Sequence, residues 1–121
     1  MKYDKIMDYI TGISSSVSEM PSDGVKMSKE IGDTSVTIFV KTNSSGEYWF
    51  AGFISYIANR RYHREKIESS MVVKTEEEII KLIEITLVIA TKLNIISEKY
   101  LEVERLEKEL TGIGEINRKV V

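Results

Sequence analysis

The sequence predicts an α+β fold: an N-terminal helix, a four-stranded antiparallel meander sheet and a long C-terminal helix, in one domain spanning residues 1–121. Apolar residues recur every three or four positions near the N-terminus, every second position between residues 25 and 56, and every three or four positions again from residue 79 to residue 110. Such a change of period indicates helix, then sheet, then helix. A chain of 121 residues is also long enough to build one core.

The N-terminal helix is predicted from a short apolar stripe. Its members are Tyr3, Ile6, Ile10, Ile13 and Val17. Gly12 and the serine run 14–16 weaken the second half of this stripe, because both residue types lower helix propensity. The segment MPSDG at 20–24 then predicts a loop.

Two turns predict the register of the first three strands. A two-residue turn at Gly32-Asp33 gives the pairs Met27–Ile38 and Val25–Val40. A four-residue turn at Asn43–Gly46 gives three further pairs, which are Val40–Trp49, Ile38–Ala51 and Val36–Phe53. Both turns place apolar side chains on the same face, and a slip of one residue would destroy that agreement. The third strand is apolar on both sides and is expected to be central. A fourth strand is expected at about Lys66 to Val73, after an arginine-rich turn.

The C-terminal helix is predicted to begin at a capping box formed by Thr75 and Glu78. About 35 residues give a length of about 50 Å, more than a sheet of short strands can cover. Its apolar stripe consists of Leu82, Ile85, Ile89, Leu93, Ile96, Tyr100, Val103, Leu106 and Leu110. In the second half this stripe is narrow and has charged flanks, as in helices that pair with another helix. We therefore expect a homodimer through this helix, with a kink possible near Asn94. The alternative is that the helix folds back on the N-terminal helix within a monomer.

Composition limits the classes of function. The net charge of −2 gives no positive field for nucleic acid or membrane, so neither is expected as a partner. With no cysteine and one histidine, the chain has little with which to hold a metal, and no cofactor is expected. No placed nucleophile, Gly-rich phosphate loop or acid–base pair is found, which predicts that the protein is not an enzyme. The N-terminus is too rich in charge for a signal peptide, so the cytoplasm is the expected location.

One stretch has unusual chemistry. YIANRRYHREK, residues 56–66, holds three of the five arginines and the only histidine, and it follows the most aromatic segment of the chain. Arginine binds phosphate oxygens through two parallel hydrogen bonds, and aromatic rings stack on bases. The stretch therefore predicts a site for a small anionic nucleotide-type ligand. The residues expected to form it are Arg60, Arg61, Arg64, Tyr56, Tyr62, His63 and Phe50, with Arg105 reaching in from a partner subunit.

A simpler interpretation of this stretch remains open. An aromatic central strand can be core, and a basic turn can be solvated or can meet the acidic side of the last helix. The acids available there are Glu102, Glu104 and Glu107. Lysine would serve such a turn equally well, and the use of arginine favours a ligand.

The element order, the chain length and the pairing of arginines with aromatics resemble the phage-encoded anti-Thoeris proteins of the first type. The resemblance implies a non-catalytic homodimer that sequesters cyclic ADP-ribose isomers made by bacterial TIR-domain enzymes. It also implies that the protein inhibits anti-phage defence in the host cytoplasm. No signature motif matches residue by residue, so no site residue is taken from that family. The alternative function is a small protein–protein inhibitor or a chaperone-like interaction module.

Overall fold

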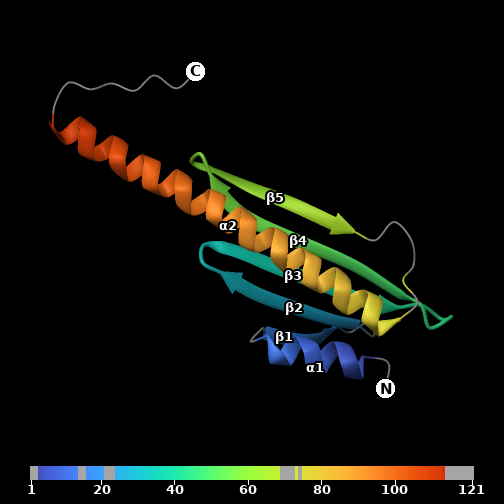
Figure 1. Ribbon diagram of the computed structural model, residues 1–121. Helices are drawn as coiled ribbons and strands as arrows, with labels where there is room; N and C mark the ends of the chain where they lie inside the picture. The colour runs from blue at the N-terminus through green and yellow to red at the C-terminus, as the bar shows by residue number, and fades with distance from the viewer. Residues whose placement is uncertain (1–2, 14–15, 21–23, 69–72, 74, 114–121) are drawn as a thin grey trace.

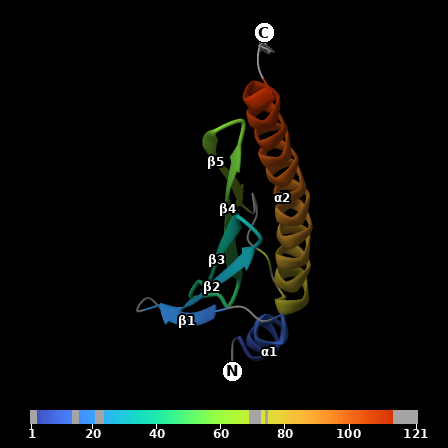
Figure 2. The ribbon, with the colours of Figure 1, turned by 90° about the vertical axis from the view of Figure 1, so that its left-hand side faces the viewer.

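The computed structural model describes residues 3–13, 16–20, 24–68, 73 and 75–113. Its elements are α1 (Asp4–Gly12), β1 (Ser16–Met20), β2 (Gly24–Ile31), β3 (Thr34–Thr42), β4 (Tyr48–Ala58), β5 (Arg61–Glu68) and α2 (Glu76–Ile113). The strands form one antiparallel sheet in the order β1-β2-β3-β4-β5. Helix α2 runs along one face of this sheet, and α1 lies beside the N-terminal end of α2 (Figures 1 and 2). The α+β class and the order of its parts are thus confirmed.

The four predicted strands correspond to β2–β5, and β1 is an additional edge strand. It comes from residues that the sequence assigned to the end of the first helix and to the following loop. The helix ends at Gly12, before the serine run that lowers helix propensity. Val17 then pairs with Met27 in β2 instead of extending the helical stripe.

The predicted register is confirmed between β2 and β3 and is wrong by one residue between β3 and β4. Val25 lies opposite Val40 and Met27 opposite Ile38, as expected. The observed β3–β4 pairs are Val40–Phe50, Ile38–Gly52 and Val36–Ile54. The loop holds one residue more than expected. The side-chain oxygen of Asn43 accepts hydrogen bonds from the amides of Ser45 (2.9 Å) and Glu47 (3.0 Å). A shift of one residue exchanges the two faces of β4.

Strand β5 begins at Arg61, five residues before its predicted start. The turn that precedes it consists of Asn59 and Arg60 alone, which have φ values of 52° and 61°. Positive φ at both central residues is what a type I′ hairpin turn requires. Most of the arginine-rich stretch is therefore strand, and of its three arginines only Arg60 lies in the turn. At the far end, Val73 forms a separate bridge to Tyr48, and residues 69–72 lie outside the described residues.

The core lies between the helices and one face of the sheet. From α2 it receives the buried residues Ile79, Ile83, Thr86, Ala90, Asn94 and Ser97. Asn94 connects α2 to the β2–β3 turn, because its side-chain oxygen accepts hydrogen bonds from the Asp33 amide (3.2 Å) and the Thr34 hydroxyl (3.1 Å). Helix α2 continues as one helix through Asn94. The asparagine there marks a contact with the turn and does not interrupt the helix.

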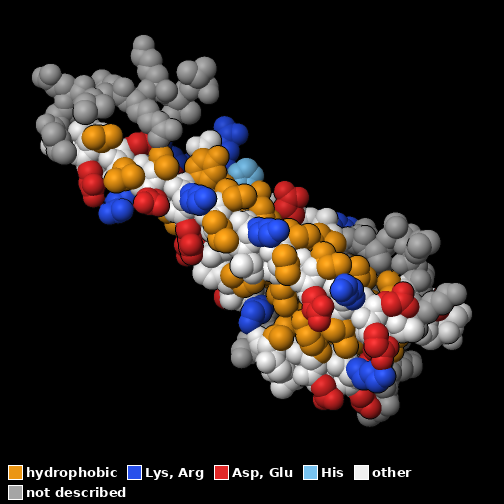
Figure 3. Space-filling view, viewed as in Figure 1, with side chains coloured by type: hydrophobic (Ala, Val, Ile, Leu, Met, Phe, Trp, Pro, Cys, Tyr) orange, Lys and Arg blue, Asp and Glu red, His pale blue; other side chains and the backbone are white. Residues whose placement is uncertain are grey.

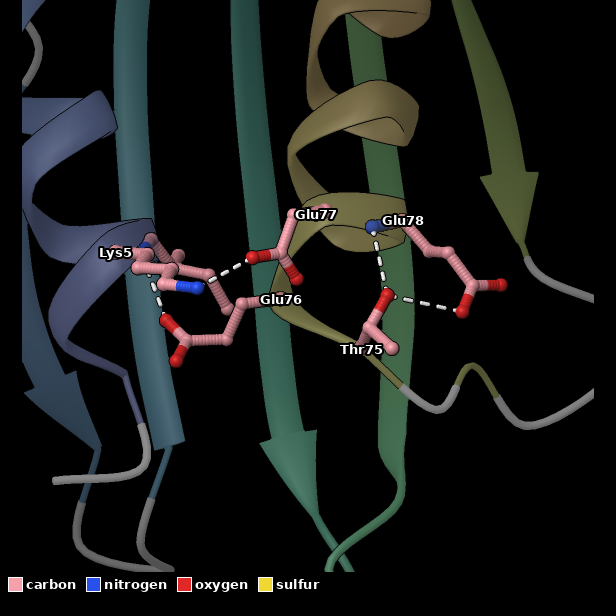
Figure 4. A network of polar contacts seen from close by, with 6 residues as sticks. Lys5, Thr75, Glu76, Glu77 and Glu78 are labelled. Carbon is pink, nitrogen blue, oxygen red and sulfur yellow. Dashed lines mark hydrogen bonds and ion pairs between the residues drawn. The ribbon is translucent and has the colours of Figure 1, made fainter.

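The first turn of α2 holds α1 in place (Figure 4). Glu76 accepts a hydrogen bond of 3.0 Å from the amide of Ile6, one of the amides that α1 leaves without an intrahelical partner. Lys5 donates to Glu77 at 2.5 Å. This hydrogen bond, with the attraction between the charges, raises the pKa of Lys5 and lowers the pKa of Glu77. The ionised Glu77 side chain therefore contributes to stability at pH values above the ordinary pKa of a glutamate. This contribution is lost as the pH falls through the lowered pKa of Glu77.

Thr75 caps the start of α2 as predicted, but the Glu78 side chain bonds to the Thr75 hydroxyl and not to the Thr75 backbone amide of a full capping box. The Thr75 hydroxyl accepts from the Glu78 amide at 3.2 Å and donates to the Glu78 carboxylate at 2.9 Å. The helix thus begins where the sequence indicates.

The far half of α2 extends past the sheet. The whole of α2 has 38 residues and spans about 57 Å, whereas β4, which has 11 residues, spans about 36 Å. Side chains of this half remain 39–47% exposed, namely Ile95, Ile96, Tyr100, Leu101, Leu106 and Leu110. Figure 3 shows hydrophobic side chains along the outward face of α2, with Lys or Arg side chains interspersed among them and acidic side chains nearby. No helix among the described residues combines the length and the apolar character of a membrane span.

Candidate functional site

The β4–β5 hairpin separates the residues that the sequence placed in one site. Successive side chains of a strand point to opposite faces of the sheet. Arg61 and His63 therefore belong to the face that α2 covers, and Tyr62 and Arg64 belong to the open face. Tyr62 is 71% exposed there. Three consecutive residues of one strand thus cannot converge on one ligand.

Arg60 contacts the acidic side of α2. Its guanidinium lies 3.4 Å from the carboxylate of Glu104 and 3.3 Å from that of Glu107. Both acids are among those that the simpler interpretation named. Arg60 is largely exposed, and a pair of this kind contributes little to stability. For this arginine, the structure favours a link between hairpin and helix over a ligand contact.

Tyr56 and His63 form a pair on the covered face. Their rings stack at 5.1 Å between centroids with an angle of 20°. Nε2 of His63 lies 3.2 Å from the carbonyl oxygen of Ala58, to which the Nε2–H tautomer donates. Both side chains are half-buried. Their contacts are therefore made within the hairpin itself.

Two other predicted residues lie apart from the hairpin surface. Phe50 is 0% exposed in the core, because the register shift turns it toward α2. The expectation that it touches a surface ligand is therefore wrong. Arg105 lies on α2, and its guanidinium is 3.6 Å from Glu109, one turn further along the same helix.

The open face carries a cluster of rings and cations, of which only Arg64 belonged to the predicted site. The Cζ atom of Arg64 lies 4.4 Å from the ring centroid of Phe53, and the Nζ atom of Lys66 lies 5.7 Å from it. Phe39 meets Phe53 edge to face at 5.9 Å, and Lys26 lies 5.8 Å from the ring of Phe39. We call these five residues the cation–aromatic cluster. It crosses four strands, from β2 to β5.

The register explains how the cluster forms. Phe39 faces Lys26 across β2–β3, and Phe53 faces Lys66 across β4–β5. Arg64 faces Ser55 two pairs further along, on the same face as Lys66. The predicted register put Phe53 in the core and Phe50 on the surface, which is why sequence reasoning omitted Phe53. If the loop is taken as the five residues 43–47, the register shifts by one residue and Phe53 is assigned to the open face.

Charge is distributed unevenly between sheet and helix. Helix α2 carries nine glutamates and five lysines or arginines, a formal charge of −4, while the whole chain carries −2. The remainder of the chain is thus formally +2, and the cluster contributes three of its cations. A chain with an acidic balance therefore still offers a cationic surface on its open face.

The chemistry available at the cluster is binding. Rings and a guanidinium can stack on a base, and three cations can meet phosphate oxygens. The cluster holds neither a nucleophile with an adjacent base nor a carboxylate pair. Among the described residues, no group of three or more His, Asp or Glu side chains could hold a metal ion. Comparison with protein-family models, curated proteins and solved structures finds no match to this chain.

Proposed function

We propose that this protein binds an anionic nucleotide-type ligand on the cation–aromatic cluster and does not convert it. One observation carries the proposal: Arg64 and Lys66 both lie over the ring of Phe53, so that cations and a flat apolar surface occupy the same place. A nucleotide presents the complementary pair, a phosphate beside a flat base. Bases stack on rings and on guanidinium planes, and phosphates pair with the cations.

The spacing of the cations favours a ligand with two phosphates. Arg64 and Lys66 lie two residues apart on one strand face, which separates their Cα atoms by about 7 Å. A pyrophosphate is long enough to contact both side chains at once. Lys26 supplies a third cation beyond Phe39. A cyclic ADP-ribose isomer has the required parts, a pyrophosphate and a base, and it is the ligand that the family resemblance implies.

The biological role follows from binding without turnover. We propose that the protein sequesters this signal stoichiometrically and so inhibits bacterial anti-phage defence. It would act in the cytoplasm, in the host cytoplasm if a phage encodes it. Neither nucleic acid nor membrane is a proposed partner, because the cationic surface is limited to a few residues of a chain with a net charge of −2.

A homodimer through α2 is the second part of the proposal. It is supported by the exposed apolar side chains in the half of α2 that extends past the sheet. Contiguous apolar surface of this kind is typical of interaction sites.

The same exposed surface favours the alternative function, a small protein–protein inhibitor or chaperone-like module. Leu101 and Ile95 are 43% and 47% exposed, respectively, and a partner protein would bury them as well as a second copy would. In that case the cation–aromatic cluster would have no ligand of its own, and its cations would only cover two surface rings.

Thermal melts separate these two functions. We expect a cyclic ADP-ribose isomer at a hundred times its Kd to stabilise the protein by about 2.7 kcal/mol. ADP-ribose, AMP and inorganic pyrophosphate, tested beside it, show which part of the ligand is recognised. Melting temperatures unchanged by all four compounds would contradict ligand binding and favour the protein–protein alternative.

A further inference from the structure

Helix α2 carries a line of apolar residues spaced seven positions apart. They are Leu82, Ile89, Ile96, Val103 and Leu110, and we call them the seam. None of them belongs to the fully buried, sheet-facing residues of the helix. A repeat of seven sustained over five positions is the pattern by which one helix packs along another.

The C-terminal part of the seam points away from the sheet, whereas Leu82 and Ile89 are half-buried and also pack against the edge of the core. Ile83 is buried against the sheet, and Ile96 follows it by thirteen residues, which at 3.6 residues per turn places it about 140° around the helix. Leu110 lies about 180° around by the same count. Ile96 and Leu110 are 43% and 39% exposed. A second element can therefore pack on the exposed part of the seam without displacing the sheet.

Charges beside the seam indicate the direction of that second element. Lys92 and Lys99 each lie three residues after a seam residue, on the side that would face a partner helix, and both are exposed. In a parallel pair each of these lysines would lie beside its own copy, which is repulsive. The acids Glu102 and Glu109 flank the seam only in its last third. An antiparallel pair brings that acidic third beside the partner's Lys92, and so relieves the repulsion at that position. Lys99, which lies close to the centre of the overlap, stays near its own copy in either direction.

We infer that α2 pairs antiparallel with α2 of a second copy of this chain, with the overlap centred near residues 97 and 98. This register overlaps the whole seam and sets Ile89 against the partner's Leu106. It also sets Lys92 beside the partner's Glu102. The inference rests on the proposed homodimer and needs no ligand.

The arrangement has a consequence for the proposed site. The order of layers becomes sheet, helix, helix, sheet, so the two open faces lie on opposite outer sides of the dimer. Each cation–aromatic cluster is then complete within one chain, and the partner's Arg105 contributes nothing to it. Two ligands would bind per dimer, and independently.

Cross-linking tests the direction of pairing, because the chain has no cysteine of its own. Ile89→Cys and Leu106→Cys are made as separate proteins, and each is treated with a short bismaleimide alone and after the two have been refolded together. We expect covalent dimer only in the mixture. In the antiparallel pair the two copies of residue 89 lie about 26 Å apart along the axis, beyond the reach of the reagent.

Other results overturn the inference. Covalent dimer from each variant alone would show parallel pairing. No covalent dimer in any sample would show that the seam is not the interface, provided that sedimentation and melting of both variants match the unmodified protein. If either variant fails to match, Lys92→Cys and Val103→Cys replace the pair: these two positions face each other in the antiparallel register, and each lies about 16 Å along the axis from its own copy, so that again only the mixture must cross-link. Nucleotide melts are independent of all these outcomes, so failure here leaves the proposed ligand untouched.

Discussion

Replacement of Gly32 by alanine is expected to lower the free energy of unfolding by about 3 kcal/mol, combining backbone strain with the loss of buried hydrogen bonds. Gly32 has φ +58°, a conformation that costs little only for glycine. A Cβ atom at this position would lie 2.6 Å from Nδ2 and 2.8 Å from Oδ1 of Asn94. The amide of Asn94 cannot move freely, because it accepts from Asp33 and Thr34 and donates to Glu98.

Gly46→Ala is the matched control for this substitution. Gly46 has φ +77°, so alanine there is strained as well, but no atom lies within 4 Å of its added Cβ. The difference between the two losses, measured by urea unfolding, isolates the contact between the turn and α2. Equal losses in both variants would show that Asn94 does not hold the β2–β3 turn against the helix.

Arg64→Lys is expected to weaken nucleotide binding ten- to a hundredfold. Lysine keeps the positive charge near Phe53 but cannot form two parallel hydrogen bonds to a phosphate or present a flat surface to a base. A charge-assisted hydrogen bond contributes about 1.5–3 kcal/mol, and about 1.4 kcal/mol corresponds to a factor of ten in affinity. Stability should change by less than about 0.5 kcal/mol, because the side chain is exposed.

Arg61→Lys provides the control on the same strand. Arg61 is also exposed, but it belongs to the opposite face of the sheet. We expect its replacement to leave affinity unchanged, as measured by calorimetric titration of each variant. Equal affinities in the two variants and the unmodified protein would remove Arg64 from the site. A loss only in Arg61→Lys would move the site to the covered face.

Local sequence signals predicted the fold where a turn or a helix start depends on nearby residues. The glycine at 32 fixed a two-residue turn, and the β2–β3 register followed from it. Thr75 and Glu78 indicated where α2 begins. The length of α2 followed from the period of its apolar residues, which persists where no sheet lies beneath.

The site was predicted less well, because it depends on one residue of register. The side-chain hydrogen bonds of Asn43 lengthen the β3–β4 loop to five residues, and no local pattern distinguishes this loop from a four-residue one. The shift buries Phe50 and places the half-buried Phe53 on the open face. Arg60 adopts positive φ, which is uncommon for a bulky residue, so the strand that follows starts earlier than expected. The contact between Gly32 and Asn94 joins residues far apart in sequence and left no local signal.

Recovery of the bound compound tests the central claim, binding without conversion, most directly. The protein is incubated with a cyclic ADP-ribose isomer, freed of unbound compound by filtration and denatured by heat, and the released molecule is identified by its mass. We predict that the compound is retained and returns intact, at about one molecule per chain, because the cluster offers stacking and charge but no reacting group. Release of a cleaved product, or no retained compound at all, would contradict this account.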